Sequence, residues 1–239
     1  LANLGSPTSI QLGTFGTIIP NFTGVQAAVL DKIAFGSVGT VALRVATANE
    51  PLDFRGANLA GVSLGANENL TFTGAFQPNV LNGQPTLRLG GGGANLTYAN
   101  SITGNTAVVL TGGSANTNYG TVFLNPTTPG SNNYRGGTIV GQNGPFGVVE
   151  VAAIANPWAV FGNGPITFVS TNPSFRPALA MPNADADMSS ASNLTAILIT
   201  GGIKFNTNRA LDADTIVFSR GIGAYSNFCL LYTSDAADE

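Results

Sequence analysis

The sequence contains no histidine, few charged residues and no long hydrophobic run. The absence of histidine excludes histidine-based catalytic triads, most zinc sites and the commonest general base. Charged residues make up 9% of the chain, against about a quarter in typical domains. No basic cluster is present, so phosphate-driven binding of nucleic acid has no electrostatic basis. The apolar runs, such as residues 148–154, are far shorter than the roughly 20 residues of a transmembrane helix.

Cysteine is also missing from the part that we expect to be native. Residues 229–239 resemble a translated sequencing adapter, and non-native tails do not contribute to a fold. This tail holds Cys229 and three of the twelve acidic residues, so nine acidic and nine basic residues remain. Without cysteine the native part has no disulfide and no thiolate chemistry. The chain begins at Leu1 without a methionine, so we expect a fragment cut at both ends.

The sequence is instead rich in glycine, asparagine and threonine. It has 31 glycines and a hydrophobic content of 44%, which is too apolar for a charge-rich disordered chain. Glycine and asparagine accept a positive φ at little cost, whereas each interior glycine weakens a helix by about 1 kcal/mol relative to alanine. The composition therefore predicts short strands joined by many tight turns.

Strand-like runs rich in β-branched, aromatic and leucine residues recur between glycine, asparagine and proline residues. The predicted strands are 9–12, 39–45, 52–55, 69–73, 86–89, 96–98, 107–110, 121–124, 137–140, 148–154, 166–170, 175–180, 194–200 and 215–219. The segment 24–35 is ambiguous, because Val25, Val29, Leu30 and Ile33 fit a helical period of 3.6 residues. We interpret it as a strand.

Many short strands without long helices leave two architectures, a sandwich of hairpins or a β-helix of successive coils. Hairpins predict strict alternation and many Asn-Gly turns between paired strands. A β-helix predicts columns of inward side chains with glycine and asparagine at the corners. The density of these two residues favours the β-helix, and Gly90 to Gly93 are interpreted as one such corner because no P-loop spacing follows them.

One pattern over residues 120–140 is more specific. A short β-branched strand is followed by a polar turn with one aromatic residue, a Gly-Gly pair and a second β-branched strand. The residues that form it are Gly120, Thr121, Leu124, Asn132, Tyr134, Gly136, Gly137, Thr138 and Val140. The pattern resembles the autotransporter-associated β-strand repeat, and the resemblance extends over about residues 105–180. It implies a right-handed, single-stranded parallel β-helix, or β-solenoid, over residues 1–228.

The residue types of this pattern also have physical roles of their own. Gly136 and Gly137 let the backbone turn where a Cβ would clash with the adjoining coil. The segment 138–140 places β-branched side chains inward, and Tyr134 is expected to stack over the next coil. Asn132 and Asn133 can satisfy turn amides with their side chains.

Three groups of carboxylates were considered as sites. Asp185 and Asp187 form a D-x-D loop that could hold Ca²⁺, but the glycine and glutamate of an EF-hand loop are missing. Asp212 and Asp214 lie near Arg209 and Arg220, as the carboxylates of a glycosidase or polysaccharide lyase would, although turn residues before a strand look the same.

Asp53 and Arg55 are the third group, for which we predict a surface ion pair worth about 0–1 kcal/mol. Four N-glycosylation patterns, at Asn21, Asn69, Asn95 and Asn193, are expected by chance in a chain of this composition. Trp158 is interpreted as a cap over the coil. No residue is predicted to be catalytic, to bind a cofactor or to ligate a metal.

The resemblance implies a function as well as a fold. Proteins with this repeat are exported to the bacterial cell surface through a C-terminal translocator barrel, and the repeat aids folding and transport. We therefore expect a non-catalytic stalk segment of an autotransporter passenger, extracellular or on the outer-membrane surface, that does not itself insert into the membrane. An adhesin that contacts a host surface or polysaccharide is the alternative. A polysaccharide-degrading β-helix enzyme is a third possibility.

Overall fold

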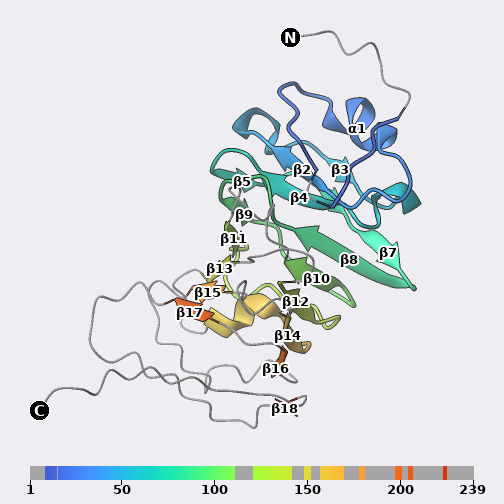
Figure 1. The fold of residues 1–239 in the computed structure, drawn as a ribbon. Helices are drawn as coiled ribbons and strands as arrows, with labels where there is room; N and C mark the ends of the chain where they lie inside the picture. The colour runs from blue at the N-terminus through green and yellow to red at the C-terminus, as the bar shows by residue number, and fades with distance from the viewer. Residues whose placement is uncertain are drawn as a thin grey trace, which may run out of the picture.

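Figure 1 shows the computed structural model, in which the strands are stacked along the length of the molecule. The structure describes residues 9–14, 16–110, 121–141, 148–151, 157–169, 178–180, 197–200, 204–206 and 223–224. Within these residues no helix has both the length and the apolar character needed to cross a membrane.

The described residues form one α-helix, four 3-10 helices and eighteen strands. The helices are α1 (Val25–Ala28), η1 (Leu30–Lys32), η2 (Val45–Thr47), η3 (Ala57–Leu59) and η4 (Pro157–Phe161). The first nine strands are β1 (Thr17–Ile18), β2 (Thr40–Leu43), β3 (Leu52–Asp53), β4 (Ser63–Ala66), β5 (Leu70–Phe72), β6 (Phe76–Gln77), β7 (Asn79–Leu81), β8 (Gln84–Leu89) and β9 (Leu96–Tyr98). The others are β10 (Ala107–Leu110), β11 (Thr121–Leu124), β12 (Thr138–Val140), β13 (Val148–Val151), β14 (Ile166–Val169), β15 (Ala178–Ala180), β16 (Ile197–Thr200), β17 (Lys204–Asn206) and β18 (Gly223–Ala224).

The fold is all-β, and nearly all of its strand pairs are parallel. One ten-stranded sheet has the order β1-β2-β4-β8-β10-β12-β14-β16-β18, with β7 attached to β8. A six-stranded sheet has the order β17-β15-β13-β11-β9-β5, and β3 and β6 form a small third sheet. From β8 onward the chain therefore alternates between the two large sheets. We call each stretch from one main-path strand of the ten-stranded sheet to the next a rung.

The core lies between the sheets and is built from side chains that stack in register. Leu87 of β8 pairs with Val108 of β10, and Leu89 pairs with Leu110 in the same way. All four side chains are at most 2% exposed. Inward leucine and valine side chains thus stack between these two neighbouring strands, which is why short strands suffice to bury an apolar column.

Aromatic rings continue this stacking at one corner. The rings of Phe54 and Phe76 are stacked with centroids 4.9 Å apart, and Phe72 and Tyr98 are stacked at 5.9 Å. Phe76 also meets Tyr98 edge to face at 6.3 Å. Such pairs add about 0.5–1.5 kcal/mol each beyond the area that they bury, so this corner is a strong contact between neighbouring rungs.

The interpretation of residues 24–35 as a strand is wrong. They form α1 and η1, and the residues at helical spacing, Val25, Val29, Leu30 and Ile33, are all at most 4% exposed. The helical period was therefore the correct signal. Gly24 takes a left-handed conformation with φ of 82° before α1, which an ordinary strand residue would not adopt.

One hairpin is also present where none was predicted. β7 pairs antiparallel with β8, and the two residues between them, Asn82 and Gly83, have φ values of 50° and 81°. Positive φ at both positions is the requirement of a type I′ turn, for which Asn-Gly is the preferred sequence. In this hairpin β7 lies along the outer side of β8 (Figure 1), and Val80 of β7 is 52% exposed.

Several predicted strand boundaries are confirmed and others shift. The strands at 86–89, 96–98, 107–110 and 121–124 are present, the first as part of β8. The strand predicted at 9–12 is reduced to an isolated bridge between Ile10 and Ile33, whereas β1, β4, β6, β7, β17 and β18 were not predicted. The strand predicted at 215–219 lies outside the described residues.

Candidate functional site

The Gly-Gly pair lies where three rungs come into close contact. A Cβ on Gly136 would lie less than 3.0 Å from the carbonyl of Thr106 in the rung before. Gly137 has a φ of 88°, and a Cβ there would lie 2.9 Å from the carbonyl oxygen of Pro165 in the rung after. The prediction that a side chain would clash with the adjoining coil is confirmed, since both contacts are to backbone atoms of the neighbouring rungs.

Asn132 joins the same three rungs by hydrogen bonds. Its side chain is buried, and its Oδ1 accepts a bond of 2.8 Å from the amide of Ile102. Its Nδ2 donates a bond of 2.9 Å to the carbonyl of Val160. Because Ile102 and Val160 lie 30 residues before and 28 residues after it, one side chain satisfies backbone groups in both neighbouring rungs. The predicted role of Asn132 is confirmed, whereas the side chain of Asn133 is exposed.

Tyr134 is fully buried and packs over the following rung. A Cβ on Gly162 would lie 2.7 Å from Cδ1 of the tyrosine ring, so the ring packs over the following rung as predicted, with a glycine beneath it. Its hydroxyl lies 2.5 Å from the hydroxyl of Thr138. Burial raises the pKa of Tyr134 well above its usual value, and the hydrogen bond to Thr138 opposes this only in part.

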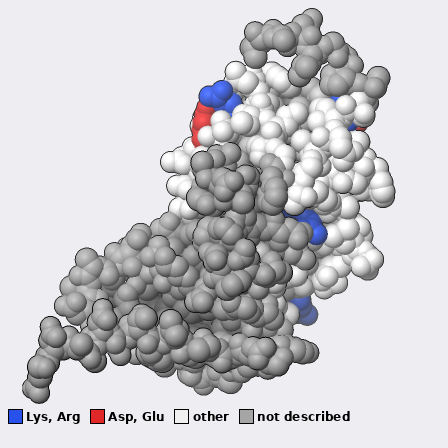
Figure 2. Space-filling view, in the orientation of Figure 1, with Lys and Arg blue, Asp and Glu red and all other residues white. Residues whose placement is uncertain are grey.

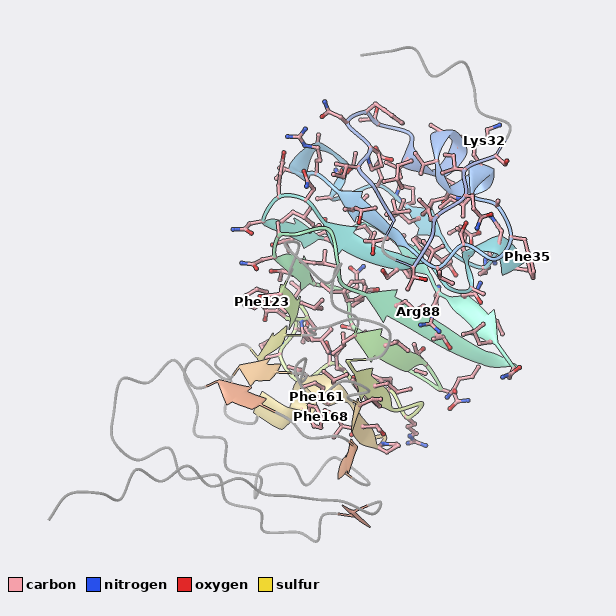
Figure 3. The ribbon with its side chains drawn as sticks, in the orientation of Figure 1. Lys32, Phe35, Arg88, Phe123, Phe161 and Phe168 are labelled. Atoms are coloured by element: carbon pink, nitrogen blue, oxygen red, sulfur yellow. The ribbon has the colours of Figure 1, made fainter. Side chains whose placement is uncertain are left out.

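The remaining motif residues lie in the strands of the two large sheets. Leu124 and Val140 are fully buried, in β11 and β12, and Thr121 opens β11 at partial exposure. Gly120 lies outside the described residues. Figure 3 places Phe161 and Phe168 inside the molecule next to this region, and both are at most 1% exposed. The described part of the motif is thus mainly a packing site.

The glycine-rich segment forms the corner that was predicted for it. All four residues from Gly90 to Gly93 have positive φ values, between 89° and 119°. A Cβ on Gly91 would meet the Thr40 side chain at 2.6 Å, and one on Gly92 would meet Ala66 backbone at 2.6 Å. These glycines allow close contact between rungs.

Asp53 and Arg55 form the predicted ion pair. Arg55 Nη2 lies 2.6 Å from Asp53 Oδ2. The Arg55 side chain is 62% exposed and the Asp53 side chain 40%. The side-chain hydrogen bonds from Arg55 hold the pKa of Asp53 below its usual value, and the Arg55 backbone amide adds to this. An exposed pair of this kind stabilises the fold by at most about 1 kcal/mol.

This ion pair lines a groove that sequence reasoning missed. The groove has a volume of about 600 Å³ and lies between α1, η1 and the segment from β3 to η3. Its polar lining consists of Gln26, Asp31, Asp53, Arg55 and Asn58. We call it the Arg55 groove. These residues lie up to 32 positions apart in the sequence (58 minus 26), so no local pattern could have assembled them.

Charge is sparse elsewhere on the described surface. Figure 2 shows few charged side chains among uncharged ones, with a basic and an acidic group in contact at the upper left. Arg44 forms an ion pair with Glu68 of the next rung and donates from Nη1 to Asn21 Oδ1 at 3.1 Å. The hydrogen bond from Arg44 lowers the pKa of Glu68, and the amide of Val45 contributes further. This pair joins rungs at a corner, and the groove does not include it.

The other predicted carboxylate groups lie outside the part that the structure describes. This applies to Asp185 and Asp187, and to Asp212, Asp214, Arg209 and Arg220. The Trp158 side chain and the tail 229–239 are likewise not described. Within the described ranges no three acidic, histidine or cysteine residues gather into a metal-binding group.

No protein-family model matches the chain, and no match was found among curated proteins or among solved structures.

Proposed function

We propose that the chain is part of a right-handed, single-stranded parallel β-helix that acts as a stalk and display scaffold on an exported bacterial surface protein. In this proposal it is non-catalytic and forms part of an autotransporter passenger. It resides outside the cell or on the outer-membrane surface, and the full-length protein carries a C-terminal translocator barrel.

The observation that carries the proposal is the contact between equivalent positions of successive rungs. Asn132 binds Ile102 and Val160, and the Gly-Gly pair meets Thr106 and Pro165. The partners all lie one rung away, and the strands on each side pair in parallel. A chain that winds around a common core in one direction gives this pattern, whereas a sandwich of hairpins would give antiparallel pairs.

The scarcity of reactive groups favours a scaffold over an enzyme. The described motif residues are buried or pack against backbone, apart from the partly exposed Thr121. Each rung buries its apolar face only against its neighbours. The resemblance to the β-strand repeat supports export. The lack of native cysteine agrees with passage through a pore. A chain without cysteine forms no disulfide, so it stays unlinked while it crosses.

Surface display tests the proposal. The chain is placed between a periplasmic signal peptide and the translocator barrel of another autotransporter, and its exposure is followed by protease added to intact cells. We expect the chain to be cleaved from the outside while periplasmic proteins stay intact. A disulfide-bonded domain in the same position serves as the stalled control. Retention of the chain in the periplasm beneath a correctly inserted barrel would contradict the proposal.

A further inference from the structure

The Arg55 groove is the described hollow that the stalk function leaves without a role. Polar side chains from three segments line it, namely Gln26 from α1, Asp31 from η1, and Asp53, Arg55 and Asn58 from the next rung. Leu30 and Leu59 close its bottom but are at most 3% exposed. The groove therefore offers mainly hydrogen-bonding groups to a ligand, with a smaller share of apolar surface.

The polar groups of the groove are held in place before any ligand arrives. The Gln26 side chain accepts a bond of 2.8 Å from the amide of Asp53 and donates one of 2.7 Å to Asp31 Oδ1. Asn58 Nδ2 donates a bond of 2.7 Å to the carbonyl of Ile33. Side chains that are already fixed lose little conformational freedom on binding, so hydrogen bonds to them contribute more to affinity.

Donors and acceptors remain at the surface of the groove beside these internal bonds. Arg55 donates from Nε and Nη2 to Asp53. Among the described residues this leaves its Nη1 able to donate to a ligand. Asp31 uses Oδ1 on Gln26, so its Oδ2 can accept. A planar guanidinium next to carboxylates and amides presents both kinds of group over a short distance.

We propose that the Arg55 groove binds a neutral, hydroxyl-rich ligand, a saccharide unit of a glycan. Hydroxyl groups both donate and accept, which matches a lining that does the same. An apolar or aromatic ligand would leave the polar groups that form most of the lining without partners. A simple cation finds the Asp53 carboxylate already paired with Arg55, and a simple anion would meet both carboxylates.

This site gives the scaffold a contact with polysaccharide, as in an adhesin. The inference does not depend on export, because the groove is formed entirely by residues 26–59 of the folded chain. Failure of surface display and failure of saccharide binding are therefore separate results.

The test uses the whole chain labelled with ¹⁵N and titrated with cellotetraose, maltotetraose and mannotetraose, with tetralysine as a cationic probe. The side-chain amides of Gln26 and Asn58 report on the groove, and that of the buried Asn132 serves as an internal reference. We expect saturable shifts of the first two with at least one tetrasaccharide and no shift of Asn132.

A double variant tests which groups bind. D53N/R55Q removes the ion pair of the groove with little change in size, and we expect it to weaken saccharide binding at least tenfold. The matched control, R44Q/E68Q, removes the ion pair outside the groove and is expected to leave affinity unchanged. Thermal unfolding of both variants confirms that they are folded.

The outcomes separate clearly. Tetrasaccharide shifts at Gln26 and Asn58 that D53N/R55Q weakens support the site. The proposal is overturned if no tetrasaccharide shifts these amides, if only tetralysine does so, or if the groove variant binds as tightly as the control.

Discussion

Glycine has two different functions at the residue scale. Gly83 has a φ of 81° with nothing within 4 Å of an added Cβ, so its role is conformational. Gly136 has an ordinary φ, but a Cβ there would press on the Thr106 backbone of the preceding rung. The first glycine is required by its turn and the second by its neighbours.

Alanine substitutions should separate these roles. Gly83→Ala is expected to destabilise the chain by about 1 kcal/mol through the left-handed backbone. Gly136→Ala should cost about 3 kcal/mol, because backbone must move in two rungs. The free energy of unfolding in urea measures both.

Gly13 provides the control for these two variants. It has no atom within 4 Å of an added Cβ and no positive φ, so Gly13→Ala should be neutral or stabilising by a few tenths of a kcal/mol. Equal losses at Gly83 and Gly136 would contradict the distinction between strain and contact.

Asn132 is the polar counterpart of these glycines. Asn132→Ala leaves a buried amide at Ile102 and a buried carbonyl at Val160 without their partner. Each orphaned group costs about 1–3 kcal/mol, so we expect a loss of about 2–4 kcal/mol in the free energy of unfolding. Asn133→Ala, at the exposed neighbour, should change it by less than about 0.5 kcal/mol. A similar loss at both positions would show that burial of the amide is unimportant.

Helix α1 shows how a short element depends on a residue far away in the sequence. It has four residues and no side-chain cap of its own, too few to be stable alone. The Glu50 carboxylate accepts hydrogen bonds of 2.9–3.1 Å from the amides of Gly24 and Val25. The next rung thus supplies the cap that the helix lacks.

Removal of this carboxylate should loosen α1 selectively. Glu50→Ala is expected to cost about 1 kcal/mol, as the loss of an N-cap does, and to speed hydrogen exchange at Gly24 and Val25. Glu68→Ala removes a carboxylate from a different corner and should leave exchange at these amides unchanged. Exchange that is as slow in Glu50→Ala as in the parent chain would exclude the capping role.

At the scale of the whole molecule, buried phenols predict how stability depends on pH. Burial raises the pKa of Tyr98 from 10.0 to about 12, and it raises that of Tyr134 further in the same direction. Below pH 10 both phenols keep their proton in the folded and unfolded states, and their contribution is constant. Above pH 10 only the unfolded chain releases the protons, so stability falls as pH rises.

The expected slope is about 1.4 kcal/mol per pH unit for each tyrosine above its unfolded pKa. Urea unfolding at a series of alkaline pH values measures it. The double variant Y98F/Y134F should be less stable at neutral pH, because Thr138 loses its partner, and should have a flatter alkaline slope. An unchanged slope would show that other groups control alkaline unfolding.

The sequence predicted the parts of this fold that depend on local spacing. The Gly-Gly pair, Asn132 and the Gly90–Gly93 corner have the predicted roles, because the residue types within each short segment indicate a corner even though their contacts lie in other rungs. Val25, Val29, Leu30 and Ile33 have the period of the helix at α1, although the many strand-like runs around them favour a strand. Asn82-Gly83 likewise has the preferred sequence of a type I′ turn.

The groove could not have been predicted in this way. Its formation depends on α1 lying against the segment after β3, and that contact is made by Gln26 and Asp53, 27 residues apart. A single sequence carries the residue types of such a site but not the register that brings them together. The ion pair of Asp53 and Arg55 was predicted because both lie in one short segment.

The position of the Gln26 amide has a consequence for association between molecules. The amides of Leu52 in β3 and of Phe54 directly after it donate to the carbonyls of Ala75 and Gln77, beside and in β6. The amide of Asp53 between them donates to Gln26 instead. Gln26 bonds to both the N–H and the carbonyl of Asp53, at 2.8 and 3.4 Å, as a neighbouring strand would. An open strand is a template on which a foreign chain can add and start aggregation. Here the Gln26 side chain of the same molecule already bonds to the free N–H and carbonyl of Asp53.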